Sequence, residues 1–109
     1  MMLTNSGYIV FGANGFIGSS FCKHLESNNL DFIAVSKSKT NIYNFKNYFT
    51  LDLEVGDPWP EELCKFFYKY RNVVFLSGIA HGEKTNVLKV NLSILRNFLN
   101  EYRPYKNSH

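Results

Sequence analysis

Three glycines at a fixed spacing are the residues in this chain best suited to chemistry. They form a GxxGxxG pattern, Gly12-Ala-Asn-Gly15-Phe-Ile-Gly18, directly after the apolar run 8–11. Gly12 allows a tight turn, Gly15 lets the backbone approach a pyrophosphate, and Gly18 allows a following helix to pack closely. The free amides at the start of that helix would face the phosphates. The pattern predicts dinucleotide binding, whereas a turn that simply needs glycine would explain one or two of the three.

Strands must lie before and beside this turn. Short apolar runs at 8–11, 32–35, 48–51 and 73–76 predict four buried strands. The segment between the second and third runs, 36–47, is rich in Ser, Lys and Asn and is typical of a loop.

Three apolar periodicities predict helices between and after the strands. Over 16–25, Ile17, Phe21 and Leu25 recur every four positions, and two asparagines at 28 and 29 offer a stop. A second helix starts near Asp57, Pro58 and Pro60, because proline is tolerated in a first turn. Its apolar face comprises Leu63, Phe66, Phe67 and Tyr70. The third helix spans about 86–102, is closed by Pro104, and carries one stripe of Leu88, Leu92, Leu95 and Leu99.

Strands that alternate with helices imply right-handed crossovers and a mainly parallel sheet covered on both faces. The expected strand order is 3-2-1-4. A chain of 109 residues buries roughly two-thirds of its unfolded surface, enough for one core but not for two lobes. The fold class is therefore α/β, with a single domain over 1–109.

Composition and charge exclude several other classes. The chain is 45% hydrophobic, 17% aromatic and 19% charged, which is typical of a compact soluble domain. Its net charge of +3 comes from scattered Lys and Arg, so nucleic acid is not a favoured partner. Neither a signal peptide nor an apolar run of about 20 residues is found, so no membrane contact is expected.

The cysteines and histidines indicate neither a disulfide nor a metal site. Cys22 and Cys64 are far apart without CxxC spacing, which favours reduced thiols and a cytoplasmic location. His24 and His81 lack the spacing of a metal site or a catalytic triad. No metal is expected.

The run 8–18, Tyr-Ile-Val-Phe-Gly-Ala-Asn-Gly-Phe-Ile-Gly, resembles the opening of the extended short-chain dehydrogenases, the NAD-dependent epimerase/dehydratase group that modifies nucleotide sugars. Three later features follow the order of that family. Asp52-Leu53 resembles its Asp-Leu pair after the third strand, the segment 73–80 resembles its fourth strand, and Asn91 resembles the Asn of the next helix. The resemblance spans 8 to about 103 and implies a Rossmann-like NAD(P)-binding domain.

The resemblance also implies roles for individual residues. In such a site the Asp52 carboxylate meets the adenine amino group, and Asn91 supports the active site. Plainer alternatives are a strand-end turn for Asp52, tight packing for Gly78, and an amide satisfied by nearby backbone for Asn91. The expected cofactor-binding residues are Gly12, Asn14, Gly15, Phe16, Ile17, Gly18, Ser36, Lys37, Asp52, Leu53, Ser77, Gly78 and Ile79.

The end of the second predicted strand departs from the pattern of NAD-preferring sites. Such sites place an acidic residue about 20 positions beyond the glycines, where it holds the ribose hydroxyls. Here that place holds Ser36, followed by Lys37, Ser38 and Lys39. Hydroxyls and lysines would accept the 2′-phosphate of NADP, so the cofactor is NAD or NADP with a slight preference for NADP. The alternative is a solvated polar loop.

The catalytic residues of the family are not matched. The family brings a Ser or Thr on a fifth strand and then a YxxxK pair on a helix. Tyr102-Arg-Pro-Tyr-Lys106 matches YxxxK literally, but Pro104 would break the helix that the pair requires. We therefore expect a partial domain that ends after the fourth strand and its helix, without catalytic residues or the substrate-binding part. Its fourth strand would then be an exposed edge that favours self-association.

Two functions from different classes fit these features. The first is the NAD(P)-binding N-terminal part of a nucleotide-sugar epimerase, dehydratase or reductase, not catalytic alone. The second is a free-standing nucleotide-binding or regulatory module without catalysis. A structural remnant that binds nothing is the third possibility.

Overall fold

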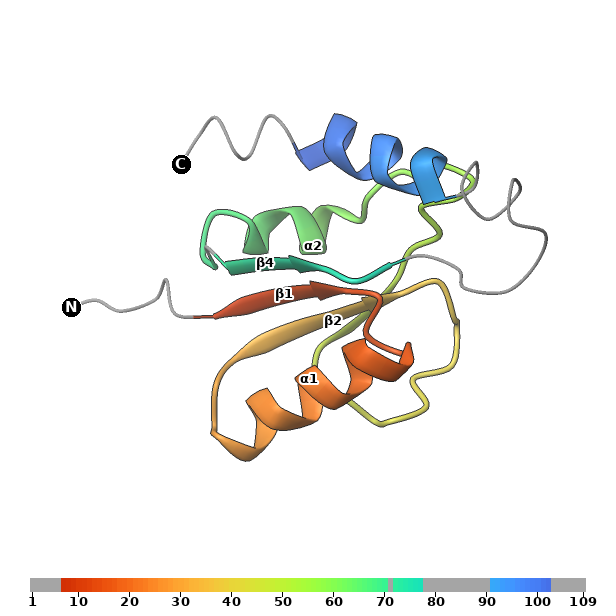
Figure 1. The fold of residues 1–109 in the computed structure, drawn as a ribbon. Helices are drawn as coiled ribbons and strands as arrows, with labels where there is room; N and C mark the ends of the chain where they lie inside the picture. The colour runs from red at the N-terminus through yellow and green to blue at the C-terminus, as the bar shows by residue number, and fades with distance from the viewer. Residues whose placement is uncertain (1–6, 71, 78–90, 103–109) are drawn as a thin grey trace.

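A computed structural model describes residues 7–70, 72–77 and 91–102 of this chain. Its four strands form one parallel sheet in the order β3-β2-β1-β4, as the sequence predicts (Figure 1). The elements are β1 (Tyr8–Phe11), α1 (Phe16–Ser27), β2 (Phe32–Ser36), β3 (Tyr48–Thr50), α2 (Glu61–Phe66) and β4 (Asn72–Phe75), and residues 91–102 are helical. Strand positions agree with the predicted ones to within one residue at each end.

β1 lies at the centre of the sheet and pairs on both sides. Ile9 is opposite Ile33 of β2 and Val73 of β4. Because all strands run in the same direction, their carboxyl ends meet along one edge. The glycine turn and the segments that follow β2, β3 and β4 therefore come together at that edge.

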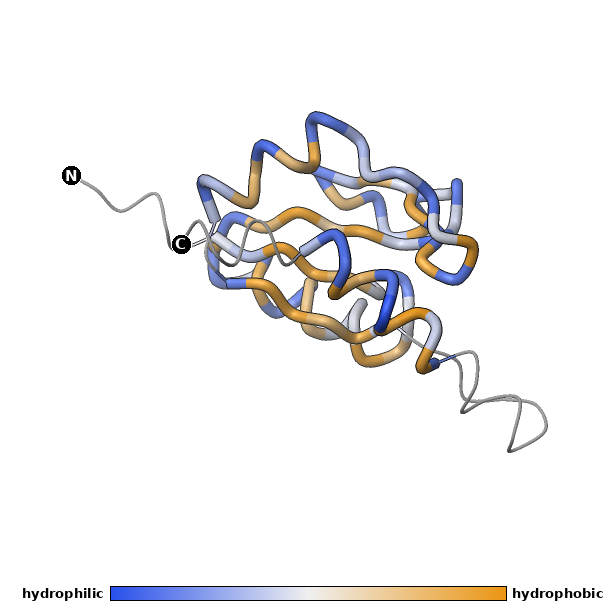
Figure 2. Tube along the Cα trace, turned by 90° about the horizontal axis from the view of Figure 1, so that it is seen from above, coloured by the Kyte–Doolittle hydropathy of each residue, from blue (hydrophilic) through white to orange (hydrophobic). Residues whose placement is uncertain are grey.

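Helices cover both faces of the sheet: α1 lies on one face, and α2 with helix 91–102 lies on the other (Figure 1). Side chains alternate along β1, so Ile9 and Phe11 face α2 while Val10 faces α1. Phe11 is the centre of an aromatic cluster, with ring centroids 4.8 Å from Phe98 and 5.4 Å from Trp59. The hydrophobic strands lie between more hydrophilic outer segments (Figure 2).

The buried face of α1 differs from the predicted row of apolar residues. Leu25 is buried as expected, but Ile17 is 66% exposed, and the face against the sheet consists of Gly18, Ser19, Cys22 and Leu25. Gly18 sets this orientation, because a Cβ there would lie 1.9 Å from the Gly12 carbonyl oxygen. The helix must turn its smallest residue toward the strands, and Ile17 lies about 100° around the axis from it.

Helix 91–102 also buries a different face from the predicted leucine stripe. Leu92 is 51% exposed and Leu99 43% exposed, with Leu95 similarly placed, whereas Ile94 and Phe98 are buried. Phe98 stacks near Phe75 of β4, with 4.5 Å between ring centroids, and the same ring contacts Phe11. Aromatic packing with the sheet decides which of two apolar faces is buried. Leu88 lies outside the described residues.

The second helix is shorter than its apolar pattern suggests. α2 ends at Phe66, and turns follow it. The predicted face is nevertheless the buried one: Leu63, Phe67 and Tyr70 are buried, and Phe66 is half-buried. Among the helices of the described residues, none has the length and apolar character that a membrane crossing requires.

Candidate functional site

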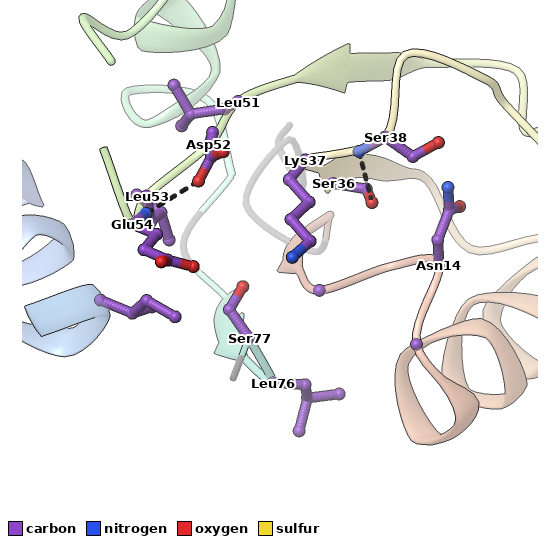
Figure 3. Close-up of a pocket in the computed structure, with 13 residues that line it drawn as sticks. Asn14, Ser36, Lys37, Ser38, Leu51, Asp52, Leu53, Glu54, Leu76 and Ser77 are labelled. Atoms are coloured by element: carbon purple, nitrogen blue, oxygen red, sulfur yellow. Dashed lines mark hydrogen bonds between the residues drawn. The ribbon is translucent and has the colours of Figure 1, made fainter. Parts of the chain in front are cut away.

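The carboxyl edge of the sheet holds a cavity of about 290 Å³ (Figure 3). Four loops and one helix contribute to it, since each parallel strand ends here. From β1 the sheet continues with β2 and β3 on one side and with β4 on the other. Ligands of open α/β sheets bind at the carboxyl end of such a switch point. The lining residues are Gly12, Asn14, Gly15, Ser36, Lys37, Ser38, Leu51, Asp52, Leu53, Glu54, Leu76, Ser77 and Ile94.

Two glycines of the turn are required by the fold itself. Gly12 has φ +88°, a conformation that favours glycine, and a Cβ there would lie 2.7 Å from the Leu76 carbonyl. Gly18 lies under the turn, with the close approach to Gly12 described above. Packing between β1, β4 and α1 therefore explains both residues without any ligand.

Gly15 is different, because no contact among the described residues demands a glycine there. Its φ is −71°, it is exposed to the cavity, and the nearest atom to an added Cβ is 3.4 Å away, an ordinary contact. α1 starts directly after it, with no side-chain cap and no acidic residue in its first turn. The first amides of a helix have no partner within that helix, so this end can donate to an anion.

The loop after β2 is tied to the glycine turn by side chains. Asn14 Nδ2 donates to the Thr40 carbonyl at 3.2 Å and to the Tyr48 hydroxyl at 3.0 Å. That hydroxyl in turn donates to the Ser38 carbonyl. Asn14 Oδ1 is buried and finds no hydrogen-bond partner among the residues of the described part. The loop 36–40 is thereby held beside the turn before any ligand arrives.

Within this loop, hydroxyls and one lysine face the cavity. The Ser36 side chain is buried at the end of β2 and accepts a hydrogen bond from the Ser38 amide at 3.3 Å. Lys37 is exposed, and its ammonium extends into the cavity from the loop side (Figure 3). This side of the cavity therefore carries positive charge.

The opposite side of the cavity is acidic. Asp52 Oδ1 accepts a hydrogen bond from the Glu54 amide at 2.9 Å, which closes a tight turn after β3. Asp52 is half-buried, and Leu53 inserts its side chain into the core while lining the cavity. The carboxylates of Asp52 and Glu54 face Lys37 across the opening (Figure 3).

The structure brings most of the predicted site residues together, but not all. The cavity contains Gly12, Asn14, Gly15, Ser36, Lys37, Asp52, Leu53 and Ser77. Phe16 and Ile17 instead expose their side chains at the start of α1, and Gly18 lies behind the turn. Gly78, Ile79 and His81 lie outside the described residues, and Asn91 is half-buried at the start of helix 91–102, where Ile94 is the cavity residue.

Five lining residues were missed by sequence reasoning. Ser38 and Glu54 directly follow predicted positions, so extending each segment by one residue would have found them. Leu51 and Leu76 are the last residues of the predicted strands, directly follow β3 and β4, and could be located in the same way. Ile94 carries no such signal, because its place depends on how its helix is rotated. The described residues contain no group of three His, Cys, Asp or Glu side chains that could hold a metal ion.

A sequence model of the NAD dependent epimerase/dehydratase family matches residues 8–104. The chain belongs to this family. Among curated protein sequences, no match was found. The epimerase/dehydratase assignment agrees with the sheet order and with the glycine turn between β1 and α1.

Several solved structures share the fold of this epimerase/dehydratase chain. L-threonine dehydrogenase from Clostridium difficile has a TM-score of 0.71 and 18% identity, over 94% of this chain and 34% of its own. UDP-glucose 4-epimerase from Thermus thermophilus, solved with NAD, has a TM-score of 0.68 and 23% identity, over 92% and 34% of the two chains. ADP-L-glycero-D-manno-heptose-6-epimerase from Helicobacter pylori has a TM-score of 0.64 and 18% identity, over 94% and 37%. The chain thus spans about a third of the length of these structures.

The two kinds of glycine in the turn should respond differently to an added methyl group. Gly18→Ala should lower the free energy of unfolding by more than about 2 kcal/mol, because backbone atoms must move to admit the Cβ. Gly15→Ala should lower it by less than about 1 kcal/mol, because its Cβ makes only an ordinary van der Waals contact with the Gly12 carbonyl oxygen. Urea denaturation measures both values. Equal losses in the two variants would contradict the close packing at Gly18.

Proposed function

We propose that this chain binds a dinucleotide, NAD or NADP, in the cavity at the carboxyl edge of its sheet. Gly15 carries this proposal: it is exposed, lines the cavity, and is a glycine that the fold does not require. A pyrophosphate lying against a bare backbone would require it. The uncapped start of α1 supplies amides for the same anion.

Each end of the cavity matches a different part of the cofactor. The Asp52 carboxylate and Leu53 backbone would hold the adenine, and Ser36 with Lys37 would hold the adenosine ribose. The amides of Phe16 and Ile17 would bind the phosphates, and Ser77 would contact the cofactor at the end of β4. Gly78 and Ile79, which lie outside the described residues, stay proposed cofactor-binding residues. A volume of about 290 Å³ is near the lower limit for small-molecule sites and suits the adenosine half.

The preference proposed here is for NADP. Lys37 extends into the cavity next to the Ser36 hydroxyl, at the position where NAD sites carry an acid. A lysine and hydroxyls can bind a 2′-phosphate through charge-assisted hydrogen bonds. The similar structures described with NAD support a dinucleotide in general rather than this preference.

For the complete active site to which this domain would contribute, the proposed reaction is the oxidation or reduction of a sugar carbon in a nucleotide sugar. The cofactor supplies the hydride chemistry, and the protein supplies binding and orientation. A UDP-glucose 4-epimerase from Thermotoga maritima, solved with UDP-glucose, shares the fold with a TM-score of 0.63. We propose that residues 1–109, as one domain, contribute cofactor binding but no turnover of their own, with Asn91 as structural support.

The proposed compartment is the cytoplasm. Cys22 and Cys64 carry free thiols in this structure. Burial, with a smaller contribution from Glu26, raises the pKa of the Cys22 thiol to about 12. That thiol is protonated and unreactive at neutral pH, and free thiols are typical of reducing compartments.

Calorimetric titration with NADPH and NADH tests the binding proposal. The wild-type chain should bind at least one of them without consuming it, and Gly15→Asp should abolish binding, since its side chain and charge would occupy the pyrophosphate position. Gly15→Ala is the matched control for folding at the same position. Absence of binding by a folded wild-type chain would refute the proposal.

Ser36→Asp tests the cofactor preference. A carboxylate at this position repels a 2′-phosphate but accepts hydrogen bonds from ribose hydroxyls. The variant should lose NADPH affinity by about tenfold or more, a change of roughly 1.4 kcal/mol in binding free energy, and should retain or gain NADH affinity. Wild-type and variant affinities come from the same titration. A wild-type chain that prefers NADH would overturn the proposed NADP preference.

We also propose that the chain self-associates through β4, which lies at one end of the sheet order with half-buried valines and Phe75. An apolar edge strand can pair with a strand of another copy. Sedimentation should show dimers whose dissociation constant rises by about tenfold when Val74 is replaced by Lys, because a charged edge disfavours pairing. A wild-type chain that sediments as a monomer at all concentrations would exclude this.

A further inference from the structure

One hydrogen bond joins the C-terminal helix to the loop at the acidic side of the cavity. Asn97 Nδ2 donates to the Leu53 carbonyl oxygen at 2.6 Å and thereby links residues 44 positions apart. Asp52 and Leu53 both line the cavity. No sequence motif considered above includes Asn97.

Three hydrogen bonds close the loop 52–57 on itself. The Glu54 amide donates to Asp52 Oδ1 at 2.9 Å, the Asp52 amide to Asp57 Oδ2 at 3.3 Å, and the Asp57 amide to the Asp52 carbonyl at 3.3 Å. These bonds fix the internal shape of the loop. They do not fix where the loop lies relative to the rest of the cavity.

Helix 91–102 supplies that placement. Ile94 forms part of the cavity wall, and Asn97 follows it by three residues on the same side of the helix. The Leu53 side chain packs into the core cluster that contains Ile94 and Phe98. Gly56, at φ +71°, passes close to the same amide, since a Cβ there would lie 3.6 Å from Asn97 Nδ2. The loop backbone therefore lies close to the Asn97 amide at both Leu53 and Gly56.

We propose that Asn97 is a positioning residue for the dinucleotide site: its amide holds the Leu53 carbonyl, and so places the Asp52 carboxylate and Leu53 backbone for the adenine. The inference rests on the proposed function. Without the amide, a part-buried carbonyl loses its donor and the loop is free to shift. A shift of the order of 1 Å at a positioning group is enough to weaken binding.

Asn97→Ala and Asn97→Asp test the proposal, with Leu99→Ala as the control on the same helix. Asp keeps the size of Asn but loses its donor, so it serves if the Ala variant does not fold. Leu99 is exposed, uncharged and lines neither the cavity nor the neighbouring hollow between Asn97 and the loop. Calorimetry with NADPH and NADH is run at a temperature where circular dichroism shows each variant folded. Hydrogen exchange of the Glu54 and Asp57 amides is measured without cofactor.

We expect both Asn97 variants to bind the preferred cofactor about three- to tenfold more weakly, with faster exchange of the two loop amides. Leu99→Ala should match wild type in both measurements. Unchanged affinity in the Asn97 variants, alongside normal wild-type binding, would overturn the positioning role alone. Loss of melting temperature without loss of affinity would make Asn97 structural and also overturn it. A wild-type chain that binds neither cofactor would overturn the proposed function and this role together.

Discussion

The close contact between Gly18 and the Gly12 carbonyl is the constraint on which the rest of the site depends. With no Cβ between them, α1 lies directly against the end of β1. This contact sets the rotation of α1, so that Cys22 and Leu25 face the sheet and Ile17 faces solvent. It also brings the uncapped start of the helix to the carboxyl edge, where the cavity forms.

The glycine turn and the strands were predictable from sequence because each depends on local information, whereas the strand order was predicted from the alternation of strands and helices along the whole chain. Short apolar runs specify buried parallel strands, and a glycine at Gly12 is needed wherever a strand must turn with positive φ. The rotation of helix 91–102 was not predictable in this way. Its sequence offers two apolar faces, and only the position of Phe11 and Phe75 in the folded sheet favours Phe98 over the leucines.

In the candidate site, too, some features were predictable from sequence and others were not. Residues adjacent to strand ends, such as Ser36, Lys37 and Asp52, could be placed from sequence because parallel strands end together. The bonds that hold the loops could not, since they join positions far apart: Asn14 to Tyr48 across 34 residues, and Asn97 to Leu53 across 44. The Asn97 amide donates to a backbone carbonyl of a loop, whereas the Asn14 amide donates to the Tyr48 hydroxyl, which itself donates to the Ser38 carbonyl. The cavity is thereby shaped largely by elements other than the loops that line it.

Because helix 91–102 has two apolar faces, it has two possible rotations against the sheet. In one rotation of the helix Ile94 and Phe98 are buried, and in the other the stripe of Leu92, Leu95 and Leu99 is buried. The two rotations differ by only about 100°, one residue along the helix. Hydrophobic burial alone discriminates weakly between two such registers, since both sets are large and apolar. A directional polar contact discriminates strongly, as a buried Asn does in a coiled coil. In the alternative register the Asn97 amide would point away from Leu53, so its hydrogen bond adds a directional contact to the aromatic packing that favours the observed face of this helix.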